Sequence, residues 1–262
     1  AGTVEQKFQL QRVYGVVVLT DCKNRVLVGP SPSDALDSAI RQRMHTATQQ
    51  YGWGSRRTAT GIGYIGGMPS LPISLPVRLW LLPHARHQRG EPVIRPVLAA
   101  ALDCTADDLP LVRDALGRPQ LATPFERYDT NWSHSGEALL LALGESMELG
   151  VDIEQLRPRP RARELAQRFF HPDEVAWLDT QADDARVLCF VRLWCAKEAV
   201  LKAHGKGVSF GLEKLVFVED GASLRLAACD PALGAPTDWT LHEWTPLDGY
   251  RAAVAWRPVA PS

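Results

Sequence analysis

The stretch that decides the fold runs from residue 150 to residue 207. It opens with GVDIE (150–154) and closes with WCAKEAVLKAHGKG (194–207). In the opening segment apolar and acidic residues alternate, which is the period-2 pattern of a strand with one apolar and one polar face. The carboxylates of Asp152 and Glu154 therefore point to the same side of the strand.

The segment 185–203 has the spacing of a helix. Trp194, Glu198 and Lys202 follow one another at i, i+4 and i+8, so they share one stripe of that helix. If this stripe faces the strand, three carboxylates and an ammonium group converge. Carboxylates held close together repel one another, and a hard divalent cation with oxygen ligands, above all Mg2+, would stabilise them together with water and a phosphate-bearing substrate. The predicted magnesium ligands are Asp152, Glu154 and Glu198.

The bulk properties exclude several classes of protein. The 262 residues carry 29 basic and 30 acidic side chains, which gives no reason to expect nucleic acid as a partner. The five cysteines are scattered without CxxC spacing, so we expect neither a zinc site nor a disulfide framework, and Cys195 is interpreted as core packing. No stretch has the length of a membrane helix and no leader is visible. We therefore expect a soluble, cytoplasmic monomer without a membrane partner.

Residues 1–75 are patterned differently from the rest of the chain. The segments 14–19 and 25–28 could form a short hairpin, and 34–50 is a polar helix candidate. The following glycine-rich run, 52–67, has few apolar anchors, and it lacks the Lys-Ser/Thr ending of a phosphate loop. We interpret residues 1–75 as a poorly patterned N-terminal extension and a candidate for disorder.

From residue 76 onward, strands and helices recur in two halves, 76–148 and 149–258. This alternation predicts an α+β fold with the organising motif at the seam between the halves. Strands are predicted at 77–82, 111–113, 138–143, 150–154, 215–218, 224–227, 239–244 and 250–256, and residues 131–136 are predicted to end one further strand. Helices are predicted at 91–102, 162–169, 172–178 and 185–203.

Four motifs in this order resemble those of the Sfp-type 4'-phosphopantetheinyl transferases. They are WSHS (132–135), GVDIE (150–154), FFHPDE (169–174) and WCAKEAVLK (194–202). The resemblance covers about residues 76–258. It implies a pseudo-dimer of two similar α/β halves, with coenzyme A and Mg2+ in the cleft between them and the active site there.

The resemblance also implies a reaction. The serine hydroxyl of an apo acyl or peptidyl carrier protein would attack the β-phosphate of coenzyme A, which transfers the 4'-phosphopantetheine arm and releases 3',5'-ADP. Mg2+ would bind Asp152, Glu154 and Glu198 together with the diphosphate, while Lys197 and Lys202 would neutralise the phosphates. Glu198 would also assist removal of the serine proton.

For the nucleotide end, the resemblance implies a second group of residues. His134, beside Ser133, would hold the 3'-phosphate. The segment Gly117-Arg118-Pro119 resembles the G(K/R)P segment that lies beside the adenine in this family. The family also places an arginine of the first half at the 3'-phosphate. Here Arg86, Arg89 and Arg95 are candidates, but Gly90, Pro92 and Pro96 interrupt the usual helical run, so the first half is shortened or altered.

Each of these features has a simpler interpretation when it is taken alone. Asp152 and Glu154 could be an exposed strand face, Glu198 and Lys202 a surface ion pair, and His134 a turn residue. Their joint occurrence at the family's spacing favours a site. Glu174 is interpreted as a helix N-terminal charge rather than a fourth metal ligand. The basic run 157–163 is either a solvated loop or the surface that receives an acidic carrier protein.

Two rival functions use the same residues. The first is a Mg2+-dependent phosphoesterase, which would give no reason for the WSHS and GRP segments. The second is a homologue that binds coenzyme A or a carrier protein without catalysing transfer, for which the altered first half is the only support. The residues leave open which pathway's carrier proteins are served and what residues 1–75 do.

Overall fold

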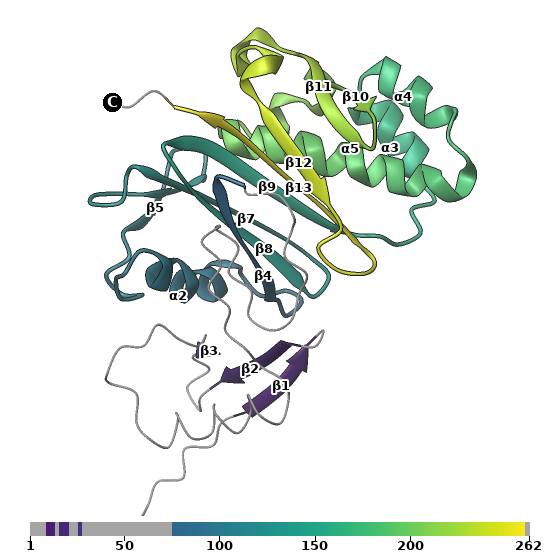
Figure 1. Cartoon of the computed structure of the whole chain (residues 1–262). Helices are drawn as coiled ribbons and strands as arrows, with labels where there is room; N and C mark the ends of the chain where they lie inside the picture. The colour runs from purple at the N-terminus through teal and green to yellow at the C-terminus, as the bar shows by residue number, and fades with distance from the viewer. Residues whose placement is uncertain (1–8, 14–15, 21–25, 28–74, 260–262) are drawn as a thin grey trace, which may run out of the picture. The chain divides into compact units, whose positions relative to one another are not determined.

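The computed structural model describes residues 9–13, 16–20, 26–27 and 75–259, and the chain divides into two compact units, 1–75 and 76–262 (Figure 1). Among the described residues, no helix is both long enough and apolar enough to cross a membrane.

The N-terminal unit contains a small antiparallel sheet. Its strands are β1 (Gln9–Val13), β2 (Val16–Thr20) and β3 (Val26–Leu27), in the order β1-β2-β3. The pairing of β2 with β3 confirms the predicted hairpin, whereas β1 was not predicted. The predicted helix at 34–50, the glycine-rich run at 52–67 and the predicted disorder lie outside the described residues.

The second unit repeats one topology twice. The elements of the first half are β4 (Val77–Pro83), α2 (Glu91–Ala101), β5 (Leu111–Arg113), β6 (Pro119–Leu121), β7 (Tyr128–Ser135) and β8 (Ala138–Glu145). Those of the second half are β9 (Met147–Gln155), α3 (Ala162–Phe169), α4 (Pro172–Asp179), α5 (Asp183–His204), the 3-10 turns η1 (Val208–Phe210) and η2 (Leu212–Lys214), β10 (Leu215–Asp220), β11 (Ser223–Cys229), the turns η3 (Pro231–Leu233) and η4 (Pro236–Asp238), β12 (Thr240–Trp244) and β13 (Tyr250–Pro258).

The two halves have equivalent sheets. In the first half the strand order is β4-β8-β7, and in the second it is β9-β13-β12. In each half a helix comes after the first strand and a two-stranded hairpin precedes the last two strands. This repetition confirms the predicted α+β fold and the pseudo-dimer of two similar halves.

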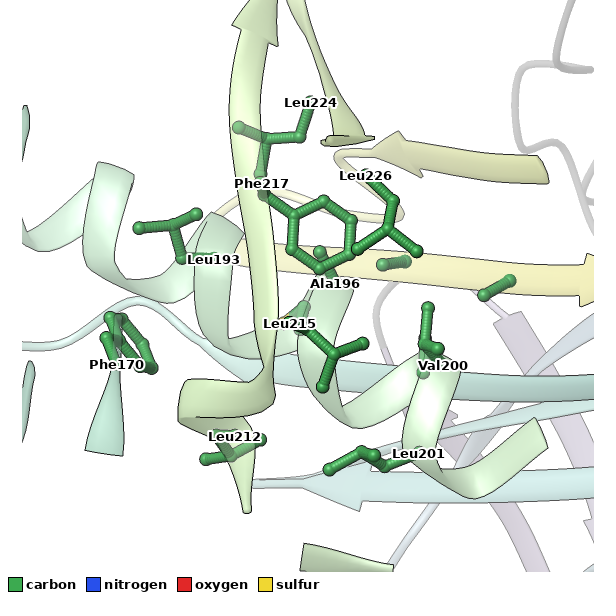
Figure 2. Packing of buried hydrophobic residues seen from close by; sticks show 14 of the residues in the cluster. Phe170, Leu193, Ala196, Val200, Leu201, Leu212, Leu215, Phe217, Leu224 and Leu226 are labelled. Carbon is green, nitrogen blue, oxygen red and sulfur yellow. The ribbon is translucent and has the colours of Figure 1, made fainter. Parts of the chain in front are cut away.

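Helix α5 is the centre of the core in the second half. It packs on β9 and β13 with one face and against the β10–β11 hairpin with another, and Figure 2 shows Leu193, Ala196 and Val200 of α5 among Leu215, Phe217 and neighbouring apolar side chains. A helix that is covered on several faces needs apolar residues around most of its circumference. For this reason the polar residues of α5 near its C-terminal end stand out, since burial removes them from water and they need partners.

Gly150 lets strand β9 approach this helix closely. A Cβ atom at Gly150 would overlap the carbonyl oxygen of Ala199 and the amide nitrogen of Ala203. Both are backbone atoms, so they cannot move aside as a flexible side chain would. The absence of a side chain at Gly150 therefore brings the following residues of β9 against the last turns of α5.

Candidate active site

Asp152 is the central acid of the candidate site. It lies on β9, its residue is 4% exposed, and its Oδ1 accepts hydrogen bonds from Lys202 Nζ at 2.7 Å and from Ser133 Oγ at 2.7 Å. Its second oxygen, Oδ2, is buried and accepts no hydrogen bond of normal geometry among the described residues, although the buried thiol of Cys195 lies close to this carboxylate. A buried carboxylate oxygen without a partner is costly, so this atom is available to a further cation or donor.

Lys202 links the two halves through this acid. Its ammonium group also donates to Ser133 Oγ at 3.0 Å and to the carbonyl oxygen of Val151 at 3.3 Å. Burial opposes the charge on Lys202, but the carboxylates of Asp152 and Glu198 outweigh it and raise the pKa of Lys202. Lys202 therefore keeps its positive charge beside the acids. The helical spacing of Glu198 and Lys202 predicted that an ammonium group would lie there.

Glu154 lies two residues further along β9 and has a separate partner. Its Oε2 accepts from Arg159 at 2.7 Å and from Ser135 Oγ at 3.0 Å. Burial and the charge of Asp152 raise the pKa of Glu154, while Arg159 acts in the opposite direction. Arg159 belongs to the basic run 157–163, which was predicted to be a solvated loop or a docking surface, not a source of partners for the acids.

Glu198 is the least compensated of the three acids. It is 8% exposed, and no hydrogen bond or ion pair holds its carboxylate in the part of the chain that the structure describes. Burial raises its pKa to about 7; Lys202 opposes this shift, and the charges of Asp152 and Glu154 reinforce it. A glutamate with a pKa near neutrality can accept a proton from a substrate at physiological pH.

Asp152, Glu154 and Glu198 all lie where β9 meets α5, but their side chains do not form the predicted cluster of three metal ligands. Within residues 75–259 and the three described N-terminal strands, no three His, Cys, Asp or Glu side chains are grouped so that they could hold a metal ion. The physical reason is that two cationic side chains divide the acids, since Lys202 holds Asp152 and Arg159 holds Glu154.

The residues nevertheless fit a divalent cation. Asp152 has a buried oxygen without a hydrogen-bond partner among the described residues. Burial, reinforced by the charges of Asp152 and Glu154, raises the pKa of Glu198, and a bound cation would oppose this shift. Oxygen ligands of this kind suit Mg2+.

Strand β7 contributes a row of polar side chains to the seam between the halves. Asp129, Asn131, Ser133 and Ser135 alternate along it. Asp129, Asn131 and Ser135 accept hydrogen bonds from the backbone amides of Leu149, Val151 and Gln155, respectively. These side chains replace a backbone ladder between β7 and β9. The period-2 spacing of these side chains is visible in the sequence. Only the tertiary structure shows that they bind the backbone of β9.

Lys197 does not lie with the acids, contrary to the prediction that it neutralises substrate phosphates. It is fully buried, and its Nζ lies 2.6 Å from Glu174 Oε2 and donates to the carbonyl oxygen of Leu212 at 2.9 Å. On a helix, adjacent residues point in different directions, so Lys197 enters the core while Glu198 faces the seam. Burial lowers the pKa of Lys197, and Glu174 opposes this shift.

Glu174 has a structural role that is larger than the predicted helix-terminal charge. Its Oε2 accepts from the backbone amide of His171 at 3.0 Å, which completes a capping box at the start of α4. Its Oε1 accepts from the amide of Phe217 at 2.8 Å in β10. With Lys197, Glu174 therefore ties α4, α5 and β10 together beneath the candidate site.

Arg118 also differs from its predicted place beside a nucleotide. Its guanidinium forms an ion pair with Asp129 and donates to the carbonyl oxygens of Lys202 and Leu149 at 3.0 and 3.3 Å. Arg118 is thus bound to the seam and to the C-terminal end of α5. Gly117 forms the tight turn before it with φ of +83°, and Pro119 begins β6, so the GRP segment is a hairpin turn.

Three of the predicted nucleotide-binding residues, His134, Arg86 and Arg89, lie at the surface of the first half. His134 is exposed near the end of β7, and its ring stacks on His84 with centroids 4.3 Å apart. Arg86 and Arg89 are exposed in the loop that begins at His84, and no side-chain hydrogen bond or ion pair engages them among the described residues. Arg95 is instead bound to Glu91 and to carbonyl oxygens, so it is committed to contacts within its own half.

Comparisons with known proteins agree with the motifs. The family model of the 4'-phosphopantetheinyl transferase superfamily matches residues 148–255. The protein slr0495 from Synechocystis sp. is 36% identical over 170 residues, which cover 62% of this chain and 68% of that protein. The 4'-phosphopantetheinyl transferase HetI from Nostoc sp. is 33% identical over 181 residues, which cover 66% and 73%. The 4'-phosphopantetheinyl transferase psf-1 from Bacillus pumilus is 32% identical over 150 residues, which cover 56% and 63%.

The family match spans the acid strand β9 and the helix α5, and the relatives extend the similarity beyond it. Together with the duplicated fold and the grouping of Asp152, Glu198 and Lys202 at the seam, this similarity leads to one assignment. The chain belongs to the 4'-phosphopantetheinyl transferase superfamily.

Proposed function

We propose that this protein transfers the 4'-phosphopantetheine arm of coenzyme A to a serine of an apo carrier protein. The observation that carries the proposal is the pair Asp152–Lys202 at the seam, with Glu198 beside it and a partnerless oxygen on Asp152. In the reaction the serine oxygen forms a bond to the β-phosphorus, the bond from that phosphorus to the bridging oxygen breaks, and 3',5'-ADP leaves.

The residues of the chain divide the work of this reaction. Lys202 stabilises negative charge on the phosphates, because it is held in the seam by several partners before the substrate arrives. Glu198 accepts the serine proton, directly or through a water molecule, because its carboxylate has no hydrogen-bond or ion-pair partner among the described residues. Asp152, Glu154 and Glu198 would hold Mg2+, which supplies charge stabilisation on the diphosphate.

The nucleotide end of coenzyme A would lie on the first half. His134, Arg86 and Arg89 are exposed cationic or titratable groups that lie on neighbouring segments of this half, and a 3'-phosphate is the chemistry that such groups bind. Lys197 and Arg118 have no part in this proposal, since both are committed to structural contacts. Ser133 acts through Asp152 and Lys202 rather than on the nucleotide.

Mass spectrometry tests the proposal directly. The protein is incubated with Mg2+, coenzyme A and an apo carrier protein, and the phosphopantetheine adduct on serine is measured. We expect adduct with the wild type and at least a hundredfold slower transfer with Glu198→Gln or Asp152→Asn, because each loses a charge at the reacting phosphate, where such groups are worth roughly 3 kcal/mol or more. Asp220→Asn, which changes an exposed carboxylate at the end of β10, is the matched control.

The same incubation separates the rival functions. Release of phosphate without an adduct would establish the phosphoesterase, and binding of coenzyme A with neither product would establish the non-catalytic homologue. Near-normal transfer by Glu198→Gln would refute the roles given to Glu198.

We further propose that the basic run 157–163 receives the acidic carrier protein. Three of its four arginines already have acidic partners, since Arg159 pairs with Glu154, Arg161 with Glu164 and Arg163 with Asp179. Arg157 is exposed and has no such partner in the described part of the chain, so it is the strongest candidate for steering.

Charge reversal at Arg157 and Arg161 tests the docking surface. Both are exposed, so Arg157→Glu/Arg161→Glu should raise the KM for carrier protein and weaken its dependence on salt while leaving the KM for coenzyme A unchanged. Arg159 is unsuitable for this experiment because its loss would also free Glu154. An unchanged KM for carrier protein would eliminate the surface.

A further inference from the structure

We propose that His84 is a positioning residue of the nucleotide subsite, which holds the ring of His134 and the loop with Arg86 and Arg89 ready for one phosphate. The inference rests on the proposed function, in which His134 binds the 3'-phosphate of coenzyme A. His84 lies directly after β4, and its backbone amide donates to Glu137 O at 2.9 Å in the β7–β8 turn. This bond brings the start of the loop beside the end of β7.

The two imidazole rings form a nearly parallel stack. Their centroids lie 4.3 Å apart and their planes differ by 17°. The partners differ in environment, because His84 is 4% exposed whereas His134 is exposed to solvent. Burial disfavours the charged form of His84, so His84 offers the face of a neutral aromatic ring to its neighbour in the stack.

The nitrogens of His84 have unequal surroundings, which fixes its role. Nε2 lies 3.1 Å from the carbonyl oxygen of Gln88, which only accepts hydrogen bonds, so Nε2 carries the hydrogen in this pairing. Nδ1 is buried without a partner among the described residues. Burial lowers the pKa of His84, and the nearby His134 lowers it further. His84 is therefore a neutral ring with its edge bonded to the loop and its face against His134.

The bond to Gln88 connects the ring to the arginines. Gln88 lies between Arg86 and Arg89 in the sequence. Its backbone amide donates to the carbonyl oxygen of Ala85 at 3.2 Å, so the loop forms a turn next to His84. One buried side chain thus fixes both an exposed imidazole and the segment that carries two exposed guanidinium groups. A histidine serving only as core packing would need neither the stack nor this loop bond.

The experiment compares ligands with and without a 3'-phosphate. The KM is measured for coenzyme A and for 3'-dephospho-coenzyme A, and the Kd for 3',5'-ADP and 5'-AMP by calorimetry. His84→Ala should raise the KM for coenzyme A and the Kd for 3',5'-ADP roughly five- to tenfold, with kcat and the values for the two ligands lacking the 3'-phosphate nearly unchanged. His84→Phe keeps an aromatic face but loses the bond to Gln88, so its effect should be smaller.

His242→Ala is the matched control. His242 also stacks on an aromatic ring, that of Trp244 at 5.5 Å, and also has a buried nitrogen without a partner in the described chain. It lies on β12 in the other half, so its loss should leave all ligand preferences unchanged. Circular dichroism and thermal unfolding establish that each variant is folded. If His84→Ala is unfolded, His84→Phe takes its place in the comparison.

The outcomes are separable. The positioning role of His84 would be overturned if the folded His84 variants lost affinity equally for ligands with and without the 3'-phosphate, or lost none. Transfer by the wild type would still support the proposed function in that case. If His134→Ala also leaves the preference for the 3'-phosphate intact, the assignment of His134 fails, and the inference about His84 fails with it. Absence of transfer by the wild type would overturn the proposed function itself.

Discussion

The two halves of the second unit share a topology but diverge after their first strand. Strand β4 leads into a short loop, residues 84–90, and the 11-residue helix α2. Strand β9 leads into residues 156–182, with α3 and α4, and then the 22-residue helix α5. Helix α5 is covered on several faces, whereas α2 buries Ile94, Val97, Leu98 and Ala99 and exposes Pro92 and Ala100.

This difference separates the chemistry of the halves. Strand β9 carries acids on its polar side, and its equivalent β4, with the sequence VRLWLLP, carries none. The second half provides the carboxylates and Lys202, while the first half provides the polar side chains of β7 and the exposed basic groups. Duplication of a fold therefore does not duplicate a site, because function depends on particular side chains placed on the fold.

The largest expected effect comes from the ion pair between Lys197 and Glu174 beneath α5, which is more deeply buried than the Arg118–Asp129 pair of the first half. Lys197→Met leaves the carboxylate of Glu174 buried without its cation, and breaking such a pair costs about 3–5 kcal/mol. Chemical denaturation measures this loss. Lys214→Met, which removes the half-exposed partner of Asp230, should cost less than about 1 kcal/mol.

The double variant Lys197→Met/Glu174→Gln sharpens this prediction. It removes both charges and should recover part of the lost stability. If Lys197→Met were instead as stable as the wild type but had a raised KM for coenzyme A, Lys197 would bind phosphate after all, as the resemblance implied.

A smaller but still large effect is expected where β9 meets α5. Gly150→Ala places a methyl group against the backbone at Ala199 and Ala203, so strand and helix must separate, at a cost of about 3 kcal/mol. Gly144→Ala is the matched control in β8 of the first half, since the atoms nearest to its Cβ would belong to the side chains of Met147 and Leu149 rather than to the backbone. Thermal unfolding of both variants compares the two glycines, and equal midpoints would contradict the argument.

The third effect depends on pH and is specific to Glu198. Its folded-state pKa of about 7 lies above the ordinary value of 4.5, so the folded protein binds this proton more tightly than the unfolded chain. The resulting stabilisation is complete below pH 4.5 and is lost as pH rises through about 7, by about 3 kcal/mol at most.

Urea unfolding of wild type and Glu198→Gln between about pH 4.5 and 8, with a chelator present, measures this contribution. The stability of the wild type should fall with pH relative to the variant. Parallel profiles would show that Glu198 titrates normally and that its environment is more polar than the structure indicates. Mg2+ should stabilise the wild type at the alkaline end of this range more than the variant, because the cation compensates the charge of Glu198.

Much of the fold was predictable because its elements have strong local patterns. The alternation in GVDIE and the long apolar helix after it predict β9 and α5, and the structure confirms both. In contrast, β1 was missed, since its five residues lack a distinctive alternation. The role of the β7 side chains was also missed, because a polar strand face has the same pattern whether it meets water or another strand.

The candidate site shows the same division, residue by residue. Helical periodicity sufficed to place Glu198 and Lys202 on one stripe facing Asp152, and the contacts agree. It could not show that Lys197 enters the core or that Arg118 closes the seam, because each forms its contacts with residues distant in the chain. A lysine that binds a substrate and a lysine that pairs with a buried glutamate carry the same charge and can lie in the same family motif. The sequence therefore does not distinguish them.

The sequence by itself determined the α+β fold, the acid strand and the helix that faces it, since these depend on hydrophobic periodicity, and the family resemblance implied the similarity of the two halves. Only the tertiary structure decided which cation neutralises which acid, which basic side chains are committed to structural contacts, and that a buried histidine stacks on an exposed one. The physical reason is that electrostatic pairing and burial depend on neighbours in space, whereas periodicity records only which way each side chain points.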